Sequence, residues 1–184
     1  AVINFYVFYL LLTYIILNII YTLRLKHIPV IDVFIISIFF MIRLLAGGEI
    51  AQVKLSVWII IMTFLLALFL ALAKRREDVL VYLSSGVKTR QIVDGYSMEF
   101  LNASMTIMAS VVMVSYIIYT VSPDVMEKTG SDKLYLTAIF VLLGILRYMQ
   151  LSFIENKGGS PTIVLFKDRF IQLAILAWFI TFGF

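Results

Sequence analysis

Residues 55–73 read LSVWIIIMTFLLALFLALA, and residues 74–78 read KRRED. The first stretch carries no charge and is long enough to cross the roughly 30 Å hydrocarbon layer of a membrane as a helix. The second stretch is strongly charged and holds both bases and acids. Together they predict a membrane-spanning helix whose end meets a polar face of the protein.

The rest of the chain follows the same pattern. Of its 184 residues, 62% are hydrophobic and 14% are charged, with a mean hydropathy of +1.04. Soluble domains carry roughly a quarter charged residues, so we predict an all-α membrane protein with one transmembrane domain over residues 1–184. Lipid-facing backbone must bond within its own helix. The six predicted transmembrane helices are Ala1–Thr22, Pro29–Ala46, Leu55–Ala73, Phe100–Val121, Leu134–Phe153 and Phe166–Phe184.

Most basic residues lie at one face of the predicted helices. Because successive spans alternate in direction, 11 of the 15 Lys and Arg residues fall at that face. Positive charge in short loops marks the cytoplasmic side. We therefore predict an integral protein of a bacterial inner membrane, with its active face in the cytoplasm. The 11 residues are Arg24, Lys26, Lys74, Arg75, Arg76, Lys88, Arg90, Arg147, Lys157, Lys167 and Arg169.

Acidic residues lie at the same face, and they indicate that its charge does more than orient the protein in the membrane. A loop that only orients a protein in the membrane has little need for acids. Carboxylates bind Mg²⁺ while phosphates complete its shell, and Arg and Lys neutralise the remaining phosphate charge. The mixed charge therefore predicts a site for an anionic ligand held partly through a divalent cation. The acids are Asp32, Glu77, Asp78, Asp94, Glu155 and Asp168.

Other features narrow the chemistry. The chain has no cysteine, which excludes a disulfide framework, a thiol nucleophile and a zinc–cysteine site. The lone His27 cannot form a multi-histidine metal site. The longest connection, Lys74–Glu99, contains the apolar stretch Val79–Leu83. We expect this stretch to form a short amphipathic helix over the cytoplasmic mouth of the helices.

Two ionisable residues lie inside the second predicted span. Such residues are costly at membrane depth and usually face a cavity or a partner. Asp32 lies near the basic face, where it could meet Lys26 or a metal ion, and we expect it to act in the site. Arg43 lies toward the other end, where snorkelling to the interface favours a structural role.

Several segments carry a shared pattern in a fixed order. They are 21–32 (YTLRLKHIPVID), 43–47 (RLLAG), 63–78 (TFLLALFLALAKRRED), 90–97 (RQIVDGYS), 147–148 (RY), 158–161 (GGSP) and 168–169 (DR). They resemble the UbiA superfamily of intramembrane prenyltransferases, and most closely its decaprenyl-phosphate phosphoribosyltransferase branch. The resemblance implies a nine-helix UbiA-type bundle, in which the six predicted spans would be the fourth to the ninth.

The sequence departs from the family pattern in two places. The usual Asp-x-x-x-Asp of the second acidic motif is absent, because Tyr82 stands four residues after Asp78. This departure favours the phosphoribosyl branch over transfer to an aromatic acceptor. The first motif, Asn-Asp-x-x-Asp-x-x-x-Asp, does not occur in the chain either. We therefore expect the C-terminal two-thirds of a longer enzyme, inactive without the preceding part.

The resemblance implies a Mg²⁺-dependent transfer at the cytoplasmic mouth. A 5-phosphoribosyl group would move from phosphoribosyl diphosphate to a polyprenyl phosphate such as decaprenyl phosphate. Glu77 and Asp78 would be the catalytic residues and the metal ligands. We expect both substrates and the bilayer as partners, and no nucleic acid; the oligomeric state stays open. The substrate-binding residues would be Tyr21, Lys26, Asp32, Arg75 and Arg76.

Other functions stay open at this point. A prenyltransferase of the same superfamily would move an isoprenoid chain onto an aromatic or other acceptor, and it predicts the aspartate pair in the long connection. A transporter or channel would line its pathway with Asp32 and Arg43, and it favours repeated, broken helices. The sequence shows no such repeat. An inactive fragment is the remaining alternative.

Overall fold

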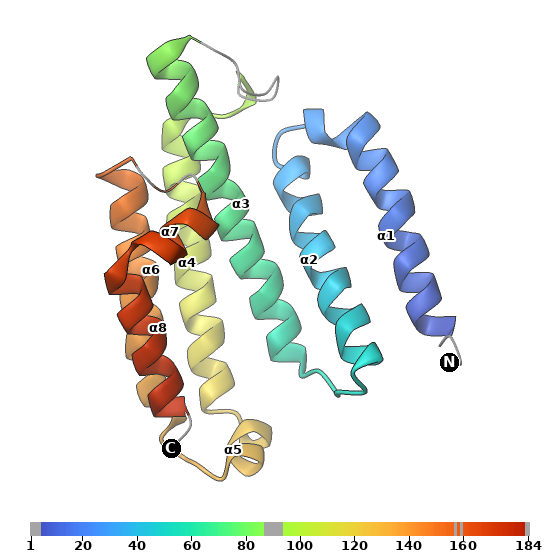
Figure 1. The fold of residues 1–184 in the computed structure, drawn as a ribbon, viewed down its shortest axis with the longest axis vertical. Coiled ribbons are helices and arrows are strands. Elements are labelled where there is room, and N and C mark those ends of the chain that lie inside the picture. The colour runs from blue at the N-terminus through green and yellow to red at the C-terminus, as the bar shows by residue number, and fades with distance from the viewer. Residues whose placement is uncertain (1–4, 87–93, 157, 159, 183–184) are drawn as a thin grey trace.

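The computed structural model describes residues 5–86, 94–156, 158 and 160–182. Within these ranges all regular elements are helices and no strand occurs, which confirms the predicted all-α class (Figure 1). The long helices are α1 (Phe5–Leu23), α2 (Ile31–Ile50), α3 (Val57–Ser85), α4 (Met98–Thr120) and α6 (Ala138–Phe153). The short ones are η1 (Leu25–His27), α5 (Pro123–Thr129), η3 (Leu134–Thr137), α7 (Pro161–Lys167) and α8 (Arg169–Phe182).

Five helical segments are long and apolar enough to cross a membrane. They are α1, α2, α3, α4 and the continuous stretch Leu134–Phe153, which joins η3 to α6. The sixth predicted span is not confirmed as one helix, because the chain breaks at Asp168 into α7 and the 14-residue α8. Asp168 is extended, and its Oδ1 accepts a hydrogen bond from the Ile171 amide at 2.9 Å. An aspartate that accepts from the third residue after it begins a new helix.

The predicted separate helix at Val79–Leu83 is wrong. These residues are the last turns of α3, which runs without a break for 29 residues. The charged segment between them and the apolar stretch is rich in good helix formers. No Gly or Pro interrupts α3 before Gly86, which takes a left-handed φ of 69° and ends the helix. At 1.5 Å per residue α3 is about 43 Å long, which exceeds the roughly 30 Å of a hydrocarbon layer.

Helix α3 is the central helix of the bundle. It packs between α2 and α4, while α6 packs on α8 and α4, and α1 contacts α2 at the edge. Figure 1 shows the beginning of α1 and the end of α8 at the same end of the bundle, as alternating spans require. The buried core centres on Val33, Phe69, Leu101, Met105 and Tyr148. This core fixes how α2, α4 and α6 sit around α3.

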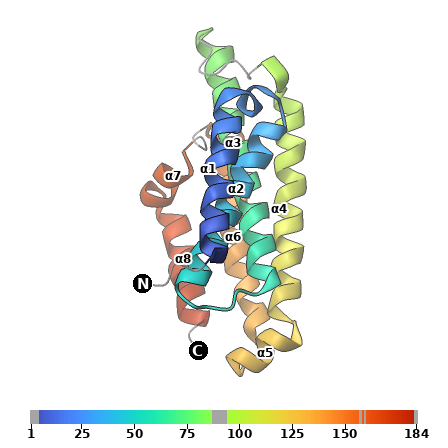
Figure 2. The ribbon, with the colours of Figure 1, turned by 90° about the vertical axis from the view of Figure 1, so that its right-hand side faces the viewer.

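The short helix α7 lies across the bundle instead of along it (Figure 1). In the view turned by 90°, α7 and α8 lie on one side and α4 on the other (Figure 2). The η1 turn and the charged end of α3 lie at the end of the bundle opposite α5. Segments far apart in the sequence therefore meet at this end.

Candidate functional site

A cavity of about 640 Å³ opens beside the middle and the charged end of α3. Its walls come from α1, α2, α3, α6, α7 and α8, and most of the lining is apolar. The charged residues in the lining are Lys74 and Arg75, and Tyr21 of α1 also lines the cavity. The cavity therefore combines a long apolar interior with a cationic end.

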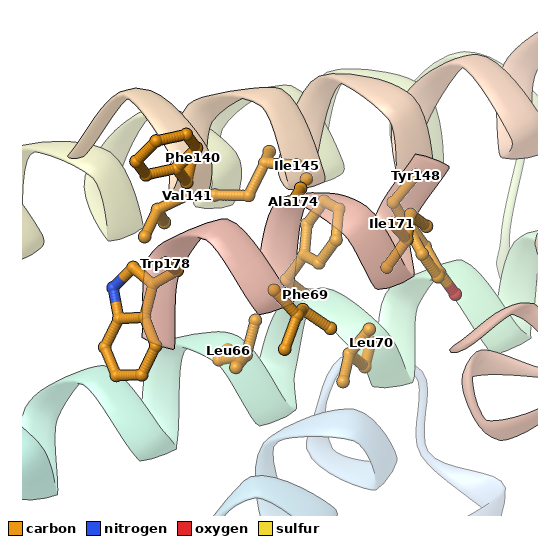
Figure 3. Close-up of a pocket in the computed structure, with 12 residues that line it drawn as sticks. Leu66, Phe69, Leu70, Phe140, Val141, Ile145, Tyr148, Ile171, Ala174 and Trp178 are labelled. Carbon is orange, nitrogen blue, oxygen red and sulfur yellow. The ribbon is translucent and has the colours of Figure 1, made fainter. Parts of the chain in front are cut away.

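A second, apolar cavity of about 260 Å³ adjoins the first. The two share the lining residues Leu66, Leu70, Tyr148 and Ile171. Figure 3 shows this second cavity between α3, α6 and α8, with Trp178 near one end and Tyr148 near the other. A molecule with an anionic head and a hydrocarbon tail matches this combined shape and polarity.

Helical periodicity brings the charged residues of α3 to the cavity. Residues three or four apart share a face of a helix, and the lining positions 63, 66–67, 70–71 and 74–75 follow that spacing. One further turn along the same face holds Glu77 and Asp78, which are half-buried. The sequence motif KRRED therefore places two bases at the cavity and two acids just beyond it.

The Arg75 guanidinium is held by two carboxylates. Its Nε donates to Asp32 Oδ2 at 2.7 Å, and its Nη1 donates to Asp78 Oδ2. The side chains of Arg75 and Asp32 are each only 1% exposed. Asp32 was expected to meet Lys26 or a metal ion, but the structure pairs it with Arg75. Among the described residues, no acceptor lies on Nη2, and Arg75 is one of the residues that line the cavity.

Tyr96 completes the surroundings of Asp32. Its hydroxyl donates to Asp32 Oδ1 and accepts a hydrogen bond from the Val30 amide at 2.8 Å. Burial, together with the hydrogen bond to Asp32, raises the pKa of Tyr96 well above its ordinary value. The residue therefore stays a neutral donor. Sequence reasoning missed its role, although Tyr96 stands in the quoted segment RQIVDGYS.

Arg76 points to the other side of α3. Its Nε donates to Asn102 Oδ1 at 2.8 Å, and its Nη1 donates to the Ser152 carbonyl and, at 3.4 Å, to Asn156 Oδ1. Its guanidinium also lies 5.2 Å from the centroid of the Phe153 ring. Arg76 thus joins α3 to α4 and to the end of α6, and it is not among the residues that line the cavity.

The remaining predicted residues lie around the same end of the bundle. Tyr21 lines the cavity and packs edge-to-face on Phe39, with ring centroids 5.7 Å apart. Lys26 is half-buried in η1 and is outside the cavity lining. Arg43 is exposed, and its guanidinium lies 4.3 Å from the centroid of the Phe40 ring. This contact supports the predicted structural role of Arg43.

Glu77 is the carboxylate best suited to meet a metal ion. No hydrogen bond or ion pair to its side chain occurs within the part of the chain that the structure describes. No cluster of three His, Cys, Asp or Glu side chains able to hold a metal is found there either. Mg²⁺ commonly takes only one or two carboxylates and completes its shell with water and substrate phosphates. Glu77 and Asp78 fit this kind of site and not a preformed metal cage.

A second ionic cluster fixes the wall that α7 contributes. Arg147 Nη2 and Nε donate to Asp168 Oδ2 at 2.8 and 3.1 Å, and Nη1 donates to Glu155 Oε1 at 3.0 Å. The hydrogen bonds from Arg147 lower the pKa of Asp168. Because Asp168 separates α7 from α8, this pair holds α7 where Val164 and Leu165 line the cavity.

Residues 1–173 match the UbiA prenyltransferase family. The chain belongs to this family. It is 30% identical over 165 residues to decaprenyl-phosphate phosphoribosyltransferase of Corynebacterium glutamicum, covering 90% of this chain and 49% of the relative. It is 31% identical over 176 residues to the protein of that name from Mycolicibacterium smegmatis, covering 92% of this chain and 55% of the relative.

A third relative with this name, from Mycobacterium tuberculosis, is 25% identical over 175 residues, which cover 94% of this chain and 56% of the relative. The resemblance inferred from the sequence segments is thereby confirmed at the level of the family. The chain is an integral membrane protein of the UbiA family, with relatives that are named transferases. It spans about half the length of the curated relatives it matches.

Proposed function

We propose that the protein containing this chain transfers a 5-phosphoribosyl group from phosphoribosyl diphosphate to a polyprenyl phosphate. The observation that carries the proposal is that Arg75, whose Nη2 has no acceptor among the described residues, lines a mostly apolar cavity together with Lys74. A buried guanidinium edge suits a phosphate oxygen. The adjoining apolar cavity suits a hydrocarbon chain. The names of the relatives supply the identity of the transferred group.

The two bases bind the phosphate groups in this proposal. Lys74 is exposed and reaches the cavity from α3 as a mobile point charge. The guanidinium of Arg75 is held by its two carboxylate partners, so its remaining N–H groups have a fixed orientation. Preset donors stabilise the charge that builds up on a leaving group without reorganising during the reaction. Arg75 would therefore contribute more to turnover than Lys74.

The reaction balances without a redox step. An oxygen of the polyprenyl phosphate forms a bond to C1 of the ribose while the bond from C1 to the diphosphate oxygen breaks. The diphosphate leaves with the electron pair. Glu77 and Asp78 would hold Mg²⁺, which supplies positive charge to the departing diphosphate when it is bound. The apolar residues that make up most of the cavity lining would exclude water from the reacting end.

The direct test uses the full-length protein in bacterial membranes. Labelled phosphoribosyl diphosphate, a polyprenyl phosphate and Mg²⁺ should give label in the lipid fraction, and chelation of Mg²⁺ should abolish it. Lys74→Gln should reduce the transfer, while Lys133→Gln, an exposed residue between α5 and η3, should not. If labelled prenyl diphosphate donates its chain and phosphoribosyl diphosphate donates nothing, the protein is an isoprenoid transferase instead.

The proposal also assigns the reacting end of the cavity to the cytoplasmic face of the membrane. The positive-inside distribution of Lys and Arg supports this orientation. Because the chain has no cysteine, a single cysteine can be introduced at Ser84, near the end of α3. A membrane-impermeant thiol reagent should label it in inverted vesicles and not in intact cells if the remainder of the protein is also free of cysteine.

A further inference from the structure

Asp32 is a buried carboxylate whose two oxygens are held from different parts of the chain. Oδ2 accepts from Arg75 Nε on α3 at 2.7 Å, and Oδ1 accepts from the Tyr96 hydroxyl just before α4. A carboxylate that is 1% exposed needs such donors, because burial without hydrogen bonds is costly. The orientation of Asp32 therefore depends on both partners.

The direction of the Arg75 guanidinium depends in turn on Asp32. A planar guanidinium held at Nε and at Nη1 has little freedom to rotate. Its remaining nitrogen, Nη2, has no acceptor in the ranges described and belongs to a side chain that lines the cavity. A change in the position of Asp32 would therefore redirect the edge that meets the ligand.

Tyr96 also contacts the connection between α1 and α2. The Val30 amide donates to its hydroxyl at 2.8 Å. Next to it, Gly95 approaches Pro29 so closely that an added Cβ would lie 2.2 Å from Pro29 Cγ. Only glycine permits this approach, so the segment before α4 rests on the residues that precede α2.

We infer that Tyr96 is a positioning residue that, through Asp32, directs Arg75 toward a phosphate group in the cavity. The inference rests on the proposed function, because it takes the cavity ligand to be a phosphate. Tyr96 lies outside the cavity lining, so it would act through Asp32 and not by touching the ligand. Its effect is on the affinity for whichever substrate places a phosphate against Arg75, and this is either the diphosphate donor or the lipid phosphate.

The first test compares kinetic constants in the full-length protein. Tyr96→Phe removes only the hydroxyl, and Tyr135→Phe, at an exposed tyrosine near the other end of the bundle, is the matched control. Tyr96→Phe should raise one KM about tenfold, the size expected for a hydrogen bond to a charged group, with a smaller change in kcat. Varying each substrate in turn shows which phosphate is concerned. An unchanged KM for both substrates overturns the inference.

The second test asks whether Tyr96 and Asp32 act in one chain of contacts. Tyr96→Phe, Asp32→Asn and the double variant form a cycle. If Tyr96 acts only through Asp32, the double variant should have the same KM as Asp32→Asn alone. Effects on KM that multiply would overturn the inference.

A third readout does not need activity. Inorganic diphosphate with Mg²⁺ should raise the unfolding temperature of the wild type and of Tyr135→Phe, but much less that of Tyr96→Phe. If diphosphate stabilises wild type much more than Tyr96→Phe, yet wild type transfers no phosphoribosyl group, the proposed function fails and the inference stands. If diphosphate does not stabilise wild type, or stabilises Tyr96→Phe equally, the inference is overturned.

A separate variant pair covers the case in which Tyr96→Phe does not fold. Gly95→Ala introduces the methyl group that meets Pro29 and should reduce the stabilisation by diphosphate. Adding Pro29→Ala removes Cγ, the atom of closest approach, and should restore much of that stabilisation. If diphosphate stabilises the double variant no more than Gly95→Ala alone, the contact with Pro29 does not position Tyr96, and the inference is contradicted.

Discussion

Asp32 on α2 and Arg75 on α3 form an ion pair of 2.7 Å in which each side chain is only 1% exposed. Removing one partner of such a pair leaves an uncompensated buried charge, which costs about 3–5 kcal/mol. Asp32→Ala should therefore lower the unfolding temperature in detergent markedly. Glu49→Ala, at an exposed carboxylate near the other end of α2, is a comparison on the same helix. Equal unfolding temperatures for the two variants would show that the pair is not a strong constraint.

Arg75 and Arg76 are adjacent but should respond differently to the same substitution. Arg75→Lys keeps the charge and loses the planar fork, so phosphoribosyl transfer should fall about 100-fold, as for the loss of one preset donor. Arg76→Lys breaks contacts to Asn102 and to the Ser152 carbonyl, so it should lower the unfolding temperature with little change in KM. Transfer assays and melting curves on both variants check this. The opposite assignment would mean that Arg76 is the phosphate contact.

Glu77 and Asp78 are predicted to bind the same metal ion, and Asp78 in addition holds Arg75. Glu77→Gln should raise the Mg²⁺ concentration needed for half-maximal transfer, because its carboxylate has no hydrogen bond or ion pair to a described residue. Asp78→Asn should lower turnover more sharply, since Asp78 also holds Arg75. Both variants should still insert in the membrane. Magnesium titrations at saturating substrates measure the effect, and an unaltered titration for Glu77→Gln would remove it from the metal site.

The pair of Arg147 and Asp168 should make stability depend on pH. Arg147 lowers the pKa of Asp168 in the folded protein below the roughly 3.9 of an unfolded chain. Its contribution is thus present above pH 4 and is lost as the pH falls through the lowered pKa. Melting curves should show wild type more stable than Asp168→Asn at pH 7, with the difference shrinking toward pH 3. Asp132→Asn, at an exposed site, serves as control, and a constant difference between wild type and Asp168→Asn would contradict the assignment.

Hydropathy and charge predicted the helical class, five of the spans and the end of the bundle where the candidate site residues gather. They did not predict that α3 continues through Val79–Leu83, because a charged segment interrupts the apolar pattern without interrupting the helix. The break at Asp168 was missed for the opposite reason. The predicted span runs from Phe166 through the charged residues Lys167, Asp168 and Arg169 as if they continued one helix.

The partners within the site were harder to predict than its location. Arg75, Arg76, Glu77 and Asp78 were predicted from their place in one charged segment, but the cavity is lined by Lys74 and Arg75 and not by Arg76. The pairing of Asp32 with Arg75 and with Tyr96 joins three separate segments of the chain, and only the packing of α2 and α4 on α3 brings them together. The angular spacing of residues on a helix could have predicted one further feature of the site. Three consecutive residues span about 200° around a helix, so Lys74, Arg75 and Arg76 could not all face one cavity.

That angular separation also constrains the length of α3. Inserting or deleting one residue between Ala67 and Lys74 would rotate every later side chain by about 100° relative to the cavity. Arg75 would leave Asp32, and Arg76 would leave Asn102, in the same step. Many apolar positions of α3 can accept another apolar residue, but its residue count in this stretch cannot change. Natural variation in α3 should therefore consist of substitutions, with insertions and deletions confined to the connection after Gly86.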